Sequence, residues 1–169
     1  MDKTFVQSQT PIFASKLFII MKYFTLAELT ASITATKLGI RNNPTATEKA
    51  CLVRLVDHIL DPLRTAYGNP IKVTSGFRCE KLNKAVGGAK SSQHRLGQAA
   101  DIRSISDTRA ENKRIFDLVH SLNLPYDQLI NEFDYDWVHV SYGPRNRRQA
   151  LDAVRDKNGK TIYKIHKFE

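Results

Sequence analysis

Residues 128–142 read QLINEFDYDWVHVSY and decide the fold class of this chain. The two ends of this stretch each predict a β-strand, and the segment DYD at 134–136 joins them through a short acidic turn. Successive side chains of a strand point to opposite faces of a sheet, so Val138 and Val140 share one face while His139 lies on the other. The valines suit a hydrophobic core, and we therefore expect His139 to face away from it.

Local signals outside this stretch predict helices before and between the strands. Capping-box patterns, which start helices, stand at 25–28, 45–48 and 108–111. Helical spacing continues after the second box, where we expect Pro62 to kink or end the helix. We also expect helical segments at 80–86 and 145–154, and strands at 71–75, 99–105, 128–133, 137–142 and 161–165. This order predicts an α+β domain with a small, mostly antiparallel sheet flanked by helices.

The composition is that of a soluble globular protein. The chain has 169 residues, of which 41% are hydrophobic and 25% charged, and this excludes a disordered chain, a collagen-like repeat or a disulfide scaffold. Its formal charge of +9 favours polyanionic surroundings, namely nucleic acid, an anionic membrane or the acidic polymers of a bacterial wall. The charge alone does not choose among these three.

The N-terminus and the cysteines add few constraints. An apolar run at 17–21 is too short for the core of a signal peptide or for a membrane span, although a degenerate export signal stays open. We expect residues 1–20 to be an N-terminal extension and residues 21–169 to form one domain. Cys51 is expected in the core and Cys79 at a partly exposed strand end, and a bridge between them stays open.

Two segments gather residues that can bind a metal. The segment 91–101 reads SSQHRLGQAAD and contains His94 and Asp101, and His139 lies on the strand described above. Two histidines and one carboxylate are sufficient to hold a catalytic zinc ion and leave a fourth position for water. Zinc lowers the pKa of that water to about 7, which makes hydroxide available at neutral pH.

Hydrolysis also needs a carboxylate that accepts the proton of the water and passes it to the leaving group. Asp136, three residues before His139, is the best-placed candidate in the sequence. Glu132 and Asp134 are the alternatives if the turn folds differently. Asp136 could equally be a plain turn residue, because aspartate is common in turns.

Two motifs together resemble a known family. HRLGQAAD at 94–101 followed by DWVH at 136–139 is similar to the signature of the zinc D-Ala-D-Ala carboxypeptidase family. That family includes vancomycin-resistance dipeptidases and phage L-alanyl-D-glutamate endopeptidases, and it shares its fold with the Hedgehog signalling domain. The resemblance runs from about residue 24 to residue 142 and implies a fold of the Hedgehog/DD-peptidase type.

The resemblance also implies roles for individual residues. The family's ligands for one Zn²⁺ ion fall on His94, Asp101 and His139. Its acid/base carboxylate falls on Asp136, where many members have glutamate. Arg78, in the segment SGFR at 75–78, matches an arginine that binds the substrate carbonyl or carboxylate and stabilises the oxyanion, and Ser92 matches a serine that helps to position the substrate.

Several other residues are given structural roles. His58, His120 and His166 are interpreted as structural or solvent-exposed histidines, and Trp137 as a packing wall beside the site. Arg145, Arg147 and Arg148 are interpreted as a solvated basic face.

The leading hypothesis is a zinc-dependent peptidase that hydrolyses an amide bond in peptidoglycan stem peptides, as a D,D-carboxypeptidase or an endolysin-type endopeptidase. The alternative is a non-catalytic, metal-containing module of the same fold that binds the cell wall or a partner. A nucleic-acid protein has no motif in its favour. We expect no specific nucleic acid, no transmembrane span and a monomer. The bond cut, and a phage or host origin, stay open.

Overall fold

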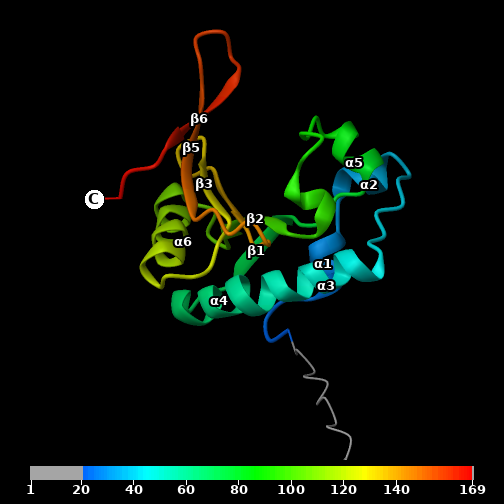
Figure 1. Ribbon diagram of the computed structural model, residues 1–169, viewed down its shortest axis with the longest axis horizontal. Helices are drawn as coiled ribbons and strands as arrows, with labels where there is room; N and C mark the ends of the chain where they lie inside the picture. Colours follow the sequence, from blue (N-terminus) through cyan, green and yellow to red (C-terminus); the bar gives the residue numbers. More distant parts are fainter. Residues whose placement is uncertain (1–20, 169) are drawn as a thin grey trace, which may run out of the picture.

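The computed structural model describes residues 21–168, and the extension expected at residues 1–20 lies outside them. Six strands form one sheet in the order β1-β2-β4-β3-β5-β6 (Figure 1). The strands are β1 Ile71–Ser75, β2 Ala99–Ser104, β3 Gln128–Glu132, β4 Trp137–Ser141, β5 Gln149–Arg155 and β6 Thr161–Ile165. The helices are α1 Leu26–Thr30, α2 Ile33–Lys37, α3 Ala46–Leu55, α4 Asp61–Tyr67, α5 Glu80–Ala85 and α6 Arg109–Ser121, with a π-helical segment η1 Val56–Leu60 and a 3₁₀ segment η2 Gln93–Leu96. No helix within residues 21–168 has the length and apolarity that a bilayer crossing requires.

The predicted capping boxes start helices as expected. Thr25 and Thr45 cap α1 and α3, and the backbone N–H of each threonine donates the reciprocal bond to the glutamate carboxylate three residues later. At α6 only half of the box forms, because Thr108 accepts from the Glu111 backbone while the Glu111 carboxylate accepts from the Tyr67 hydroxyl at 2.5 Å. The Glu111 carboxylate therefore bonds to Tyr67 on α4 and links the two helices, whereas in a full capping box it would bond to the backbone of Thr108.

The helix that contains Pro62 does not end there. The chain runs from α3 through η1 into α4, and the N–H of Asp61 bonds to the carbonyl of Val56, five residues earlier. Proline has no N–H and its ring clashes with the carbonyl four residues before it, so a π-helical turn lets the helix continue past it. The helix ends at Gly68, whose φ of 79° is the left-handed conformation that glycine adopts readily.

The sheet is mixed, and the α+β fold class is confirmed. Strands β3 and β5 pair in parallel, whereas the other four neighbouring pairs are antiparallel. The helix expected over residues 145–154 is wrong, because this segment is a loop followed by β5. Its Ala, Leu and Arg residues favour a helix locally, but β5 is held between β3 and β6, and such non-local pairing overrides local propensity.

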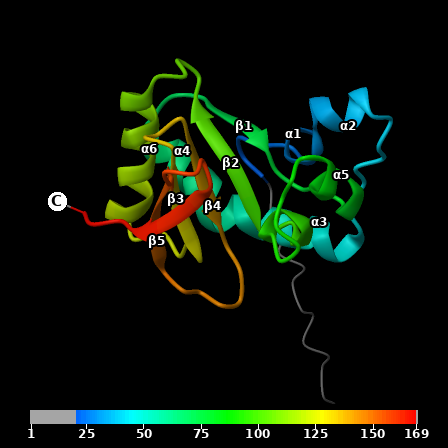
Figure 2. The same ribbon diagram turned by 90° about the horizontal axis from the view of Figure 1, so that it is seen from above.

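The two faces of the sheet have different functions in the fold. One face packs against α6 and against the continuous helix formed by α3, η1 and α4 (Figure 2). Val138 and Val140 join the main core on this face, as predicted. The opposite face has only a small apolar cluster of its own, made by Ile130, Leu151 and Ala153. His139 lies on this second face, which is left open for a site.

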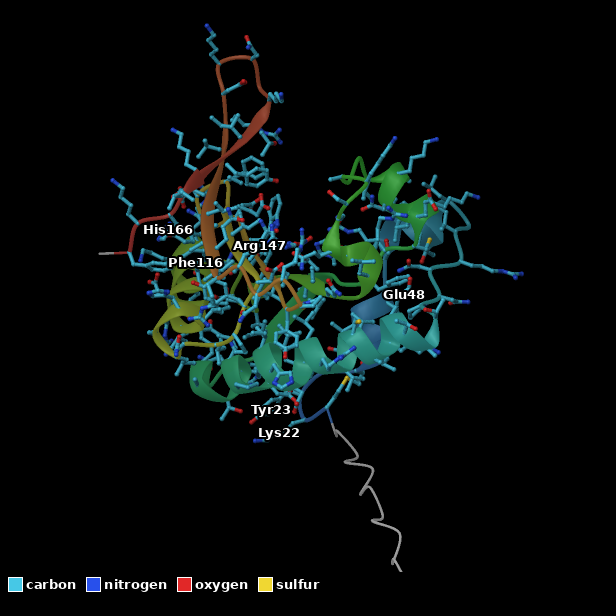
Figure 3. All side chains as sticks on the ribbon, in the orientation of Figure 1. Lys22, Tyr23, Glu48, Phe116, Arg147 and His166 are labelled. Carbon is cyan, nitrogen blue, oxygen red and sulfur yellow. The ribbon has the colours of Figure 1, made fainter. Side chains whose placement is uncertain are left out.

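The C-terminal segment folds back onto α6. His166 packs edge-on against Phe116 and bonds to Asp152 at 2.8 Å (Figure 3). His120 stacks on Phe168, so both histidines have the structural roles that we expected. Cys51 and Cys79 are free thiols and are both partly buried, so no bridge forms between them.

Candidate metal centre

Three side chains converge on the open face of the sheet. Asp101 on β2 and His139 on β4 are direct cross-strand partners, and His94 on η2 approaches from above the strands. The Asp101 Oδ1 atom lies 2.9 Å from His139 Nδ1 and 3.2 Å from His94 Nε2, and the two ring nitrogens are 3.2 Å apart. All three residues are buried, and together they form a group that could hold a metal ion.

This triangle fits a tetrahedral zinc ion. With zinc–ligand bonds of about 2.0–2.1 Å, neighbouring ligand atoms of a tetrahedron lie about 3.3 Å apart. The observed separations of 2.9–3.2 Å between the two nitrogens and the oxygen are close to this value. Two imidazoles and one carboxylate also leave a fourth position, as catalytic zinc sites do.

The backbone around His94 fixes its orientation. His94 Nδ1 lies 2.7 Å from the carbonyl oxygen of Gly76, so a proton on Nδ1 leaves Nε2 free as a ligand. Gly97 ends η2 with a φ of 66°, and a Cβ there would lie 2.4 Å from the Glu48 carbonyl oxygen. A glycine is therefore required at this position, which lets η2 pack closely against α3.

Arg78 holds Asp101, the third candidate ligand, in place. Its Nη2 donates to Asp101 Oδ2 at 2.5 Å, and its Nε donates to Ser75 Oγ at 2.7 Å. The Oδ1 atom of Asp101 is thus left to face the histidines. Burial opposes the ionisation of Asp101, but the His94 and His139 imidazoles outweigh it and hold the pKa of Asp101 well below its usual range.

The triangle lies in a cleft of about 900 Å³. Arg78 and Ser92 line this cleft together with the three candidate ligands, so the structure brings all five residues to one place. The Ser92 side chain makes no cap hydrogen bond to η2. Trp137 forms part of the wall, as expected.

Asp136 does not join this group. Its carboxylate points to Arg103, 3.3 Å from Nη2, and its side chain is 46% exposed. Asp136 belongs to the turn before β4, and this turn directs its carboxylate away from His139. Neither Asp136 nor Asp134 lines the cleft, and Asp134 pairs with Arg109 at the surface.

Glu132 does line the cleft. It is 7% exposed, and its carboxylate makes no hydrogen bond or ion pair within residues 21–168. Burial raises the pKa of Glu132 to about 7, against the opposing effect of the His139 imidazole. Alternation along β3 could have indicated this orientation, since Gln128, Ile130 and Glu132 share the face of His139.

The loop before β5 contains contacts that sequence reasoning missed. Asp127 is fully buried and accepts from Arg147 Nη2 at 2.7 Å and from Gln93 Nε2 at 2.8 Å. Arg147 is exposed, as expected, but it also ties this loop to η2 on the cleft side of the sheet (Figure 3). Arg148 is likewise held, because it donates to the carbonyl of Leu124 at 2.6 Å.

Two buried imidazoles and a carboxylate in a cleft of an α+β sheet form a candidate metal site with the donor set that zinc hydrolases use. The same donor set also binds iron in some oxygenases, so the site alone does not fix the metal. A family model for Peptidase M15 matches residues 22–141, and the chain belongs to this family of zinc peptidases, which includes the D-Ala-D-Ala carboxypeptidase type. The resemblance seen in the sequence is thereby confirmed. No curated protein matches the chain.

Proposed function

We propose that the protein is a zinc-dependent peptidase that hydrolyses an amide bond in peptidoglycan stem peptides. The observation that carries this proposal is the convergence of His94, Asp101 and His139 in an open cleft of a Peptidase M15 chain. These three residues would hold a single zinc ion. When bound, zinc supplies a Lewis acid and a water whose pKa is lowered to about 7.

Glu132 is our first candidate for the proton acceptor. It would take a proton from the attacking water and pass it to the amide nitrogen as the C–N bond breaks. A group that does this works best with a pKa near the operating pH, and burial gives Glu132 a pKa of about 7. Asp136, which the family motif favours, is the second candidate and would have to leave Arg103 to act.

Arg78 and Ser92 would bind the substrate. Arg78 uses Nε and Nη2 for Ser75 and Asp101, and its Nη1 makes no hydrogen bond within residues 21–168. This free donor would bind the oxygen of the scissile carbonyl as negative charge develops on it. The Ser92 hydroxyl lines the same cleft and would bind a polar group of the peptide.

The proposal is tested by incubating purified sacculi with the zinc-loaded protein and analysing the released fragments by mass spectrometry. We expect soluble muropeptides, and their new chain ends identify the bond and distinguish a carboxypeptidase from an endopeptidase. A chelator, His94→Ala and His139→Ala should each abolish release. Zinc binding without release of any fragment would instead favour a non-catalytic wall-binding module.

A matched pair of variants tests the proton acceptor. Glu132→Gln should keep zinc but lose a factor of about 10²–10⁴ in rate, whereas Asp136→Asn should keep most of the activity. Both substitutions remove one negative charge and almost no volume, so each controls for the other. The reverse result would transfer the role to Asp136.

A further inference from the structure

One wall of the cleft lies outside the part of the chain that matches the family. The family model ends at residue 141, whereas β5 and β6 form a hairpin over Gln149–Ile165 that projects from the body of the protein (Figure 1). The cleft-lining residues of this hairpin are Gln149, Leu151, Arg155, Thr161, Tyr163 and Ile165. They alternate along both strands, so one whole face of the hairpin is directed at the cleft.

The strand register aligns this face with the metal centre. Asp101, His139, Ile130, Leu151 and Ile165 form one continuous row across the strands β2, β4, β3, β5 and β6. A parallel row contains Trp137, Glu132, Ala153 and Tyr163. The hairpin therefore extends the face that carries the candidate ligands, and Tyr163 and Ile165 are 55% and 69% exposed there. Large apolar side chains left exposed on a concave face are typical of binding surfaces.

Arg155 differs from the other arginines of the cleft. Arg78 pairs with Asp101, and both Arg145 and Arg147 lie within 4.0 Å of Asp127. Arg155 has no carboxylate within ion-pair distance among residues 21–168. Its positive charge is therefore available to a ligand.

The guanidinium of Arg155 is also held in place. Its Nη1 donates to the Gly159 carbonyl at 3.2 Å and to Thr161 Oγ1 at 2.9 Å, and the group lies over the Phe133 ring at 4.5 Å. Nε and Nη2 make no hydrogen bond within the described chain. A fixed, planar guanidinium with two free N–H donors can donate to both oxygens of one carboxylate.

We infer that the β5–β6 hairpin is a recognition wall for an anionic part of the substrate, in which Arg155 binds a carboxylate and Tyr163 packs against the neighbouring apolar atoms. Arg155 lies four residues along β5 from Leu151, or about 13 Å, and β5 is two strands, or about 10 Å, from His139 on β4. Arg155 is therefore roughly 16 Å from the candidate ligands, which an extended peptide of about five residues spans. The carboxylate therefore belongs to a group several residues from the bond that is cut. This inference rests on the proposed function for the site, but its test does not require turnover.

The test uses fluorescence of Trp137, the single tryptophan of the chain, which lines the cleft and packs against Phe133. The probes are two synthetic peptides, Ala-Ala-Ala-Asp-Ala and its Asn counterpart with an amidated C-terminus in both, titrated into zinc-loaded protein. We expect the Asp peptide to bind at least about tenfold more tightly than the Asn peptide, as for a charge-assisted bidentate contact. Arg155→Gln should remove this preference, and Arg155→Lys should retain only part of it.

Lys157→Gln is the matched control, since it removes the same charge from the turn of the same hairpin but does not line the cleft. It should keep the preference for the Asp peptide. Equal binding of both peptides by the unmodified protein, no binding of either, or equal weakening of both by Arg155→Gln would overturn the inference. A protein that prefers the Asp peptide but releases nothing from sacculi would refute the proposed function and leave the anion-binding wall standing.

Discussion

Glu132→Gln should stabilise the metal-free protein at alkaline pH. Burial raises the pKa of Glu132 from 4.5 to about 7, so between these pH values the folded chain binds more protons than the unfolded chain. Stability therefore falls as pH rises through this window and stays lower above it. At 1.36 kcal/mol per pKa unit the penalty is at most about 3 kcal/mol, and glutamine removes it because it never ionises.

The measurement is urea unfolding of both proteins in chelator at pH 4 and pH 8. We expect the free energies of unfolding to differ little at pH 4, and the variant to be the more stable by up to about 3 kcal/mol at pH 8. Asp136→Asn is the control, since its half-exposed side chain should give a difference below about 0.5 kcal/mol at both pH values. A Glu132→Gln effect that is the same at pH 4 and pH 8 would show that the carboxylate is not desolvated, and it would remove the main argument for its role as base.

Three other substitutions test the scaffold. Gly76→Ala places a Cβ 2.2 Å from the Leu29 carbonyl oxygen, so we expect the free energy of unfolding to fall by at least about 2 kcal/mol. Because the Gly76 carbonyl orients His94, zinc binding should also weaken about 10–100-fold, measured by chelator competition. Unchanged zinc affinity would contradict this expectation. Asp127→Asn should cost about 2–3 kcal/mol at pH 7, measured by urea unfolding. Burial raises the pKa of Asp127, but the Arg147 hydrogen bonds outweigh it and lower the pKa, so this stability exists above the unfolded pKa and is lost as pH falls through the folded one. An equal cost at pH 3 would refute that reasoning. Arg78→Lys keeps the positive charge but loses the guanidinium, whose Nε and Nη2 donate to Ser75 and Asp101. The substitution should lower the rate of muropeptide release by a factor of about 10². Full activity of this variant would exclude the proposed role of Arg78.

Local signals predicted much of the fold correctly and singled out the three residues that the structure brings together. The capping boxes at Thr25 and Thr45 act within a single turn, so the sequence contains all the information they need. Strand alternation placed Val138 and Val140 in the core and His139 on the opposite face. His94, Asp101 and His139 could be singled out because two short motifs contain them.

Non-local pairing explains what the sequence did not predict. The segment 145–154 has the composition of a helix, and only its position between β3 and β6 makes it a strand. The family spacing favoured Asp136, but the turn before β4 directs its carboxylate to Arg103, which is far away in the chain. The ion pair of Arg147 was not predicted, because its buried partner, Asp127, lies 20 residues earlier.

A crystal structure of the zinc-loaded protein, with anomalous data collected at the zinc edge, tests the metal centre most directly. We predict one strong peak bonded to His94 Nε2, His139 Nδ1 and Asp101 Oδ1 at about 2.0–2.2 Å, with the fourth position open to the cleft. An ion bound elsewhere, or a site in which any of these three side chains turns away from the metal, would contradict the assignment.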